Sequence, residues 1–501
     1  MKLAKHLLLF PLVGLLSCTN LEETLNDSLT KEQATDLVSV QALIDASYSG
    51  LRTPFQDQSR FWAAQQHTTD ETLGPTRGPD WDDNGIWRVL HDHTWTPEHA
   101  FLGDTYNELL QVVFSTTNAL DFNPSAEQAA EARYLRAFVM FCLADGWNQV
   151  PFRQPGENLL NAPQVLSGGE AMDFVISELN DVIADLPEGP TNRANKDAAR
   201  VLLMKAYLNK GTFADRKSPS FPASDMQQVI AIADQLIASG KYSLANNYFD
   251  NFAPNNNSIS TENIWTAENQ GGVSSGNVRS RWFCTLHYNQ NPSGWNGFAT
   301  LSDFYDSFEE NDVRRSASYT GTTDVSGIKV GLLQGQQFDA AGNALKDRKG
   351  NNLDFTREVK LVETGDNLEI TGIRVVKYPI DYNGGDNADN DYVYFRYADV
   401  LLMKAEAHLR TGDEAGARGV VNSIRTKRNA SPLSTLTLDE LLAERSRELY
   451  WEGWRRQDMI RFGKFLDAWQ EKPASGPERL LFPIPAQALA VNPNLSQNPG
   501  Y

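Results

Sequence analysis

The chain has 501 residues, of which 41% are hydrophobic, and this length allows about two or three packed units. Its mean hydropathy of −0.44 is typical of a soluble globular protein once any targeting segment is removed. A formal net charge of −19 argues against nucleic acid as a partner, because phosphate binding needs a basic surface. Several of the eleven tryptophans stand in polar, glycine-rich surroundings, where core packing explains them poorly.

The N-terminus has the pattern of a lipoprotein signal. Two lysines precede an apolar run over residues 7–16, which is too short to span a bilayer. Ser17 and Cys18 close this run, and a small residue before a cysteine is typical of lipoprotein cleavage. We expect residues 1–17 to be a signal peptide, Cys18 to be lipidated and residues 18–30 to form a polar tether. The alternative is an ordinary signal peptide cut nearby. No second hydrophobic span follows, so a lipid is the only membrane attachment expected.

Helical patterns recur along the remaining chain. Two helices close on a glycine turn, KAYLNKG (205–211) and EAHLRTG (406–412), and each is followed by a second helix. This arrangement resembles a degenerate tetratricopeptide unit, and unrelated helical hairpins are the alternative. The predicted helices run over about 34–51, 100–122, 127–145, 170–185, 195–211, 225–239, 397–410, 413–428 and 437–452.

The stretch ERSRELYWEGWRRQDMIRFGKF (444–465) predicts one helix that ends in a turn at Gly463. Small and apolar residues recur in it at helical spacing, and opposite charges stand three or four residues apart. The expected ion pairs are Glu444–Arg447, Glu452–Arg455 and Glu452–Arg456. We interpret its two tryptophans, Trp451 and Trp454, as packing residues.

Two regions break the helical pattern. Residues 52–99 are rich in aromatic and acidic side chains, and residues 240–395 are dense in Asn, Gly and Ser, with short strands such as GIRVVKYP (372–379). Long ordered loops on a rigid frame are where binding sites are usually built. The fold class is therefore predominantly α, a tetratricopeptide-like helical hairpin scaffold with long loop-rich insertions and a few short strands.

The first candidate ligand loop covers residues 68–95. A sugar ring offers an apolar face to an indole and hydroxyls to carboxylates, amides and guanidinium groups, and this loop contains that mixture. Trp81, flanked by aspartates, is the least core-like of its tryptophans. The alternative for Trp87 and Trp95 is that they anchor the loop to the frame. The predicted ligand-binding residues here are Trp81, Asp70, Arg77, Asp83 and Asn84.

The second candidate loop covers residues 274–298 and alternates aromatic side chains with Arg and Asn. Its Gly-Trp-Asn-Gly sequence predicts that Trp295 stands on a flexible turn as a binding platform. The alternative is a hydrophobic plug leading into the next helix, and the aromatic residues at 304–308 are expected to be core. The predicted ligand-binding residues are Trp295, Trp282, Tyr288 and Asn296.

No cofactor or metal is predicted. His-x-His at His91 and His93 can ligate zinc, but no cysteine or firm carboxylate spacing completes a site, so hydrogen-bonded structural histidines are expected. The acidic residues at 386–391 do not have the spacing of the twelve-residue calcium loop, and a turn rich in Asx residues is favoured. Cys142 and Cys284 are expected to be free, with a disulfide as the alternative.

A glycosidase would need two carboxylates across a cleft, and Asp70 and Glu71 are the first candidates. Adjacent residues are poorly placed to flank one bond, and 64 acidic residues make some such pair inevitable. No G-x-S-x-G, H-E-x-x-H or phosphate-binding glycine loop is found where it would be needed. We expect a binding protein rather than an enzyme.

Four segments, in order, resemble the signature segments of the SusD/RagB-like family. The likeness covers nearly the whole mature chain. The segments are EARYLRAFVMFCLADGWNQVPF (131–152), YFRYADVLLMKAEAHLRTGD (394–413), ERSRELYWEGWRRQDMIRFG (444–463) and LLFPIPAQALAVNPNLSQNPGY (480–501).

The resemblance implies a lipid-anchored protein of the outer membrane that pairs with a SusC-like TonB-dependent transporter and captures oligosaccharides for it. Glu22 and Glu23, just after the cysteine, resemble the export signal of surface lipoproteins. Family members that take peptides provide the alternative ligand, and Arg77, Arg279 and Arg281 could hold carboxylates. The expected parts are an N-terminal helical part (31–239) with a ligand loop at 52–99, a ligand-face insertion (240–395) and a C-terminal helical part (396–501).

Overall fold

A computed structural model describes residues 39–501 of the protein. The predicted signal peptide (1–17), the lipidation site Cys18 and the tether (18–30) lie outside the described residues, as does the start of the helix predicted over 34–51. Residues Val40–Tyr501 pack as one unit. Within the described part, no helix is both long and apolar enough to cross a membrane.

Helices dominate, as the periodicity predicts. The longer helices are α2 (Val40–Gln56), α3 (Arg60–Gln66), α5 (Ala100–Ala119), α6 (Ala126–Trp147), α7 (Gly168–Val182), α8 (Lys196–Ala214), α9 (Ala223–Ala238), α14 (Tyr397–Arg410), α15 (Glu414–Lys427), α16 (Leu438–Leu449), α17 (Arg455–Arg461) and α18 (Ala486–Val491). Single turns are η1 (Asp83–Gly85), α4 (Arg88–His91), η2 (Tyr248–Phe252), α10 (Asn256–Ile259), α11 (Ser280–Phe283), α12 (Ser302–Asp306), α13 (Thr323–Ser326) and η3 (Pro477–Leu480).

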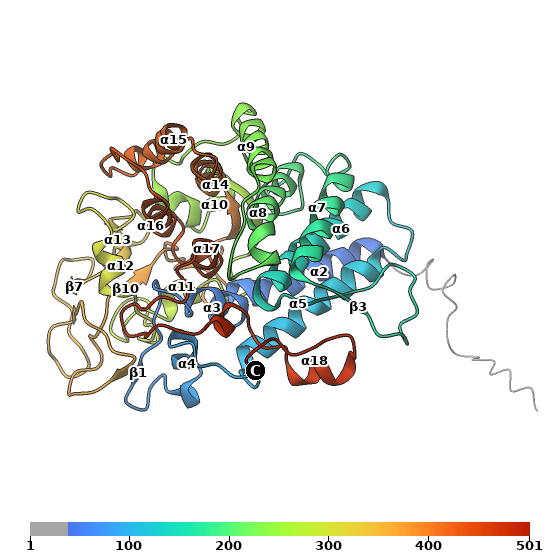
Figure 1. Cartoon of the computed structure of the whole chain (residues 1–501). Helices are drawn as coiled ribbons and strands as arrows, with labels where there is room; N and C mark the ends of the chain where they lie inside the picture. Colours follow the sequence, from blue (N-terminus) through green and yellow to red (C-terminus); the bar gives the residue numbers. More distant parts are fainter. Residues whose placement is uncertain (1–38) are drawn as a thin grey trace, which may run out of the picture. The chain divides into compact units, whose positions relative to one another are not determined.

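The long helices pack in chain order. Helices α5, α6, α7, α8 and α9 each contact the next, and α9 then contacts α14, which pairs with α15 (Figure 1). The succession therefore continues across the insertion, and the predominantly helical, tetratricopeptide-like scaffold is confirmed. On α15, Ala417, Val421 and Ile424 are fully buried against α14, as the predicted hairpin requires.

Helix α6 lies at the centre of the scaffold. Ser125 and Gln128 form a reciprocal capping box at its start, and Asn148 ends it in the left-handed conformation (φ 65°). Every residue from Tyr134 to Trp147 is buried, so the helix is surrounded on all sides. Cys142 is among them, and it and Cys284 are both free and buried.

The prediction of one helix over 444–465 is wrong. Helix α16 ends at Leu449 and α17 begins at Arg455, because Trp451 (φ 60°) and Gly453 (φ 82°) adopt left-handed conformations between them. The break sends the fully buried Trp451 indole into the core, where it donates to the Glu71 carbonyl oxygen (3.3 Å). The packing role of both tryptophans is confirmed, since Trp454 is 4% exposed.

The break also changes which residues the glutamates of this segment pair with. Glu444 pairs with Arg447 as predicted (2.8 Å). Glu452, however, contacts neither of its predicted arginine partners, because its carboxylate turns inward to Arg396 (2.8 Å) and Lys377 (2.6 Å).

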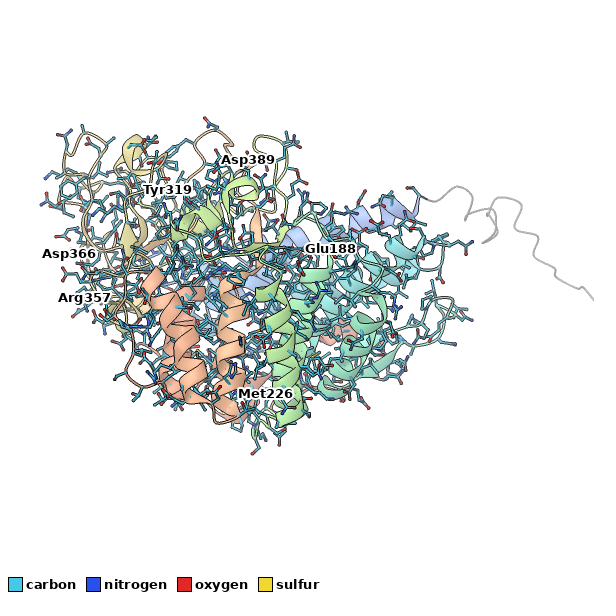
Figure 2. All side chains as sticks on the ribbon, turned by 90° about the horizontal axis from the view of Figure 1, so that it is seen from above. Glu188, Met226, Tyr319, Arg357, Asp366 and Asp389 are labelled. Atoms are coloured by element: carbon cyan, nitrogen blue, oxygen red, sulfur yellow. The ribbon has the colours of Figure 1, made fainter. Side chains whose placement is uncertain are left out.

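Residues 240–395 form loops joined by small sheets, and β10 confirms the strand predicted over 372–379. Strand β4 pairs with β11, and β6 lies between β5 and β10. Figure 2 shows Tyr319, Arg357 and Asp366 among these loops and Met226 on the helical side. The strands are β1 (Thr76–Arg77), β2 (Val150–Phe152), β3 (Gln164–Leu166), β4 (Asn263–Ala267), β5 (Ser316–Ala317), β6 (Val330–Leu333), β7 (Gly335–Gln336), β8 (Asp354–Phe355), β9 (Val362–Glu363), β10 (Arg374–Val376) and β11 (Tyr392–Arg396).

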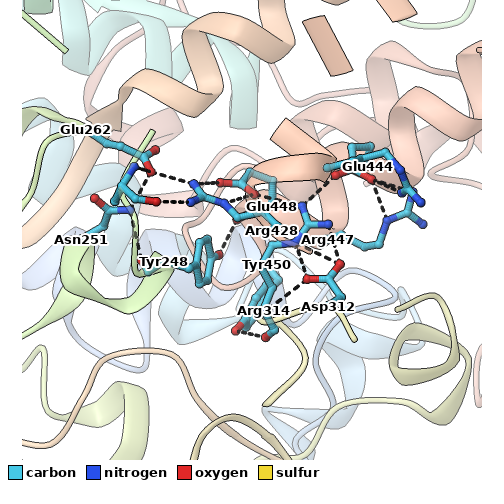
Figure 3. Close-up of polar contacts among 12 residues, drawn as sticks. Tyr248, Asn251, Glu262, Asp312, Arg314, Arg428, Glu444, Arg447, Glu448 and Tyr450 are labelled. Atoms are coloured by element: carbon cyan, nitrogen blue, oxygen red, sulfur yellow. Dashed lines mark hydrogen bonds and ion pairs between the residues drawn. The ribbon is translucent and has the colours of Figure 1, made fainter. Parts of the chain in front are cut away.

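A buried ion network joins this loop-rich region to α16 (Figure 3). Glu448 accepts from Arg314 (2.9 Å), Arg396 (2.7 Å) and Arg428 (2.9 Å), and Arg428 also binds Glu262 (2.6 Å). Burial raises the pKa of Glu448, but the three guanidinium groups outweigh it and lower that pKa well below its ordinary value. The carboxylate is therefore ionised and neutralises arginines from three separate segments.

Glu448→Ala should lower the free energy of unfolding by about 3–5 kcal/mol, because it leaves buried guanidinium groups without their partner. Urea denaturation at neutral pH measures this loss. Asp173→Ala breaks an exposed pair with Lys210 and is the control, with an expected loss below about 1 kcal/mol. Equal losses in the two variants would contradict the role given to the network.

Candidate functional site

The two aromatic loops predicted as ligand loops meet in the structure. Trp81 Nε1 donates to the carbonyl oxygen of Trp295 (3.0 Å), and the two ring centroids are 6.2 Å apart with planes inclined at 57°. A backbone bridge between Leu73 and Ala299 holds the loops together below the rings. Two indoles from distant parts of the sequence thus stand side by side.

Trp81 is held in place by its backbone and by a glycine. Its left-handed conformation (φ 61°) is uncommon for a bulky residue and costs about 1–3 kcal/mol, which the surrounding contacts must offset. The indole lies directly on Gly297, where a Cβ atom would come within 2.1 Å of the ring. Phe298 (4.9 Å) and Trp87 (5.7 Å) pack around the partly buried ring.

Trp295 is the more accessible of the two, with 43% of its surface exposed. Its backbone N–H donates to the carbonyl oxygen of Phe283 (2.8 Å), and the Phe283 ring meets the indole edge-on at 5.0 Å. Arg279 covers Phe283 at 4.5 Å and pairs with Asp386. The indole is therefore exposed, with the Phe283 ring and the Trp81 ring as its aromatic neighbours.

Tyr288 adds a third aromatic ring near Trp81. Its hydroxyl lies 3.5 Å from Asp80 Oδ2, on the residue just before Trp81. The Arg348 guanidinium stacks on the tyrosine ring (4.0 Å) and donates to Glu369 (2.6 Å), which also contacts His287 Nε2 (3.0 Å). This chain of contacts fixes the half-buried Tyr288 ring beside the loop that carries Trp81.

Three predicted ligand-binding residues lie beneath the surface and brace the loops. Arg77 is buried and donates to the carbonyl oxygens of Leu368 (2.8 Å) and Thr371 (2.9 Å). Asn296 is buried and accepts from Arg374 (2.9 Å), and Trp282 is only 2% exposed. Arg77 and Asn296 thus bind other residues of the protein, and all three side chains are buried away from the surface.

The remaining predicted residues differ in their surroundings. Asp70 forms a two-bond ion pair with Arg455 of α17 (2.6 and 2.7 Å). Asp83 accepts from Trp87 Nε1 (2.8 Å) but is exposed, and the neighbouring Asn84 is exposed with φ 56°. Of these three residues, only Asp83 and Asn84 are exposed on the loop near Trp81.

Glu71, the other carboxylate of the hydrolase candidate pair, lies in the core. It accepts from the Ser446 hydroxyl (2.6 Å) and contacts the Trp451 backbone N–H (3.4 Å). Burial raises the pKa of this carboxyl to about 7, against the opposing effect of Arg455. Asp70 and Glu71 thus tie the ligand loop to the α16–α17 segment and do not face each other across a cleft.

The histidines of the first loop are hydrogen-bonded, as expected. His91 contacts the carbonyl oxygens of Thr72 (3.3 Å) and Gln470 (3.2 Å), and His93 contacts the Thr68 carbonyl oxygen (2.9 Å). Burial lowers the pKa of both imidazoles, so they are neutral at neutral pH. Across residues 39–501, no three His, Cys, Asp or Glu side chains gather as a metal-binding group would.

The model of the SusD family matches residues 231–476. The starch-binding protein SusD of Bacteroides thetaiotaomicron is 27% identical to the chain, over 86% of this chain and 84% of the relative. The chain belongs to the SusD/RagB family.

Solved structures of the SusD superfamily share the fold. A protein from Parabacteroides distasonis superimposes with a TM-score of 0.74 at 19% identity, over 95% of this chain and all of the other. Surface glycan-binding protein A from Bacteroides thetaiotaomicron, solved with laminarihexaose, gives a TM-score of 0.68 at 18% identity, over 92% and 98% of the two chains.

In this SusD/RagB family member, several residues that pack against Trp81, Trp295 and Tyr288 could not be identified as site residues from the sequence. Phe283 and the fully buried Phe298 stand in the second loop, and nothing in the sequence around them separates them from the core residues Phe304 and Phe308 that follow. Arg348 and Glu369 come from a segment without a tryptophan, far along the chain from Tyr288. No local signal marks these residues, because their role depends on which loops meet.

Between about pH 4.5 and 7, native Glu71 keeps a proton that the unfolded chain has released, so this carboxyl makes the free energy of unfolding fall as pH rises, opposite to the effect of buried histidines such as His91 and His93. The Glu71 carboxyl alone lowers the free energy of unfolding by about 3 kcal/mol over that pH interval. Glu71→Gln cannot titrate at this position, so the difference in unfolding free energy between variant and wild type should change by about 3 kcal/mol over the interval, in favour of the variant at the higher pH. Urea unfolding at several pH values measures it, with the exposed Glu157→Gln as the control. An unchanged slope in Glu71→Gln would contradict the assignment.

Proposed function

We propose that this protein is a cell-surface lipoprotein that binds oligosaccharides through Trp81 and Trp295 and delivers them to a SusC-like TonB-dependent transporter of the outer membrane. The observation that carries the proposal is the pair of indoles presented side by side by two distant loops. Family membership and the name of the starch-binding relative support glycan as the ligand class. The lipid at Cys18 and the transporter partner are parts of the proposal taken from the family resemblance.

The geometry favours a chain of sugars over a single small molecule. The indole planes are inclined at 57°, so the two rings can contact successive units of a bent oligosaccharide. Exposed Asp83 and Asn84, with the Tyr288 ring nearby, supply partners for sugar hydroxyls. The rings are held from behind by Gly297 and Phe283, which limits the entropy lost on binding.

The peptide alternative receives no support from the arginines named for it. Arg77 and Arg281 are buried and donate to backbone carbonyl groups, and Arg279 is paired with Asp386. None of the three offers an unpaired guanidinium to a peptide carboxylate. We therefore retain the glycan as the proposed ligand.

Trp81→Ala and Trp295→Ala should each weaken glycan binding by about tenfold or more, because each removes a stacking surface from the centre of the site. Electrophoresis in gels containing soluble starch or laminarin measures the retardation of each variant. Phe114→Ala is the control, since this ring is 51% exposed on α5 and away from both loops. If a glycan retards the wild type and both tryptophan variants equally, the site assignment is wrong.

Gly297→Ala should weaken the same glycan interaction although it removes no ligand contact. A Cβ atom at this position would displace the Trp81 indole, which lies 2.1 Å from the place the atom would occupy. We expect a loss of about tenfold, similar to that of a removed hot-spot residue. Gly419→Ala is the matched control, because an added Cβ there meets no atom within 4 Å. Wild-type retardation of Gly297→Ala would show that Trp81 need not be held in this position.

A further inference from the structure

A polar hollow is formed by residues outside the two aromatic loops. Its volume is about 390 Å³, and it is formed by segments around α12, α13 and β7, which lie together in Figure 1. It contains none of the residues proposed for the Trp81–Trp295 site. The side chains that matter for its chemistry are Tyr305, Glu310, Arg315, Lys329, Gln336 and Phe338.

Two cations line this hollow without an acidic partner. The Arg315 guanidinium lies over the Tyr305 ring at 4.3 Å, and across residues 39–501 it forms no ion pair or side-chain hydrogen bond. Lys329 is exposed and likewise has no partner in that part of the chain. The adjacent Arg314, by contrast, binds three carboxylates. In a chain of net charge −19, two unpaired cations in one hollow are available for a negatively charged ligand.

The same hollow offers acceptors and an apolar face. The Gln336 amide nitrogen donates to the carbonyl oxygens of Gln337 (2.7 Å) and Leu345 (3.0 Å), and the Gln337 amide nitrogen donates to that of Gly335 (2.8 Å). Neither side-chain oxygen accepts from a donor within residues 39–501, so both remain able to accept from hydroxyls. The Phe338 ring is 46% exposed at the edge of the hollow.

We propose that this hollow is a second saccharide subsite that takes an acidic sugar, bearing a carboxylate or a sulfate group. Arg315 and Lys329 bind the anionic group, the glutamine oxygens accept from ring hydroxyls, and Phe338 contacts the apolar ring face. Glu310 lines the same hollow, and its carboxylate disfavours ions of higher negative charge such as free phosphate. The subsite thus selects for a charged unit within a glycan chain.

Isothermal titration of the mature protein with tetragalacturonate, a sulfated carrageenan tetrasaccharide and neutral maltotetraose tests this subsite. We expect one or both acidic probes to bind and to weaken as NaCl is raised from about 50 to 500 mM. The carboxylated and sulfated probes distinguish the two sources of negative charge. Arg315→Gln and Lys329→Gln should each reduce the affinity for the acidic probe about tenfold.

Controls separate this subsite from the aromatic loops and from misfolding. Lys217→Gln removes an equally exposed charge elsewhere and should bind like the wild type. Trp81→Ala should keep the affinity for the acidic probe, so this result is independent of the proposed function. Lys329→Gln changes an exposed residue and keeps the test valid if Arg315→Gln fails to fold. Wild-type binding by Lys329→Gln, equal binding of maltotetraose, or no binding of either acidic probe would overturn the proposal.

Discussion

The need to neutralise buried charge determines how the parts of this protein fit together. Glu448 at the end of α16 is fully buried and binds Arg314, Arg396 and Arg428, which come from the insertion, the end of β11 and the end of α15. A buried ion pair adds little net stability against an apolar substitute, but leaving one partner alone is costly. The network therefore fixes the position of α16, because Glu448 must lie where these three guanidinium groups converge.

From α16 the constraint extends to the ligand loop. The chain leaves α16 through the left-handed Trp451, whose indole donates to the Glu71 carbonyl oxygen, while Ser446 donates to the Glu71 carboxylate. Arg455 at the start of α17 then binds Asp70. These contacts fix the beginning of the segment that carries Trp81. Through Asp70 and Glu71, the α16–α17 segment thus helps to set where the loop that carries Trp81 stands.

The helical scaffold could be predicted from the sequence, but the break between α16 and α17 could not. The helix expected over 397–410 forms with those bounds, because apolar periodicity and a following glycine turn are local signals. The break after Leu449 is only partly local: Gly453 permits a left-handed turn, but Trp451 leaves the helix because a core position beside Trp62 and Glu71 receives its indole. Gly453 shows locally that the helix could end here, but nothing in the neighbouring residues indicates that Trp451 would turn into the core.

The candidate site was also predictable only in part from the sequence. Composition directed attention to two loops that the structure brings together. It could not separate the exposed residues of one loop from the buried ones. Trp282 and Trp295 both stand among Asn, Arg and Gly, yet Trp282 is 2% exposed and Trp295 43%. Arg77 has the chemistry of a ligand-binding residue, but it satisfies backbone carbonyl groups of a distant segment. Which side chain faces outward depends on the packing of loops far apart in sequence, and no single-loop pattern contains that information.

The proposed function requires that glycan binds on the paired indoles of Trp81 and Trp295. A crystal structure of the protein with an oligosaccharide of the polysaccharide that retards it in gels tests this most directly. We expect sugar rings stacked on Trp81 and Trp295, with sugar hydroxyls near Asp83 or Asn84. Sugar density at another surface, with both indoles unoccupied, would contradict it.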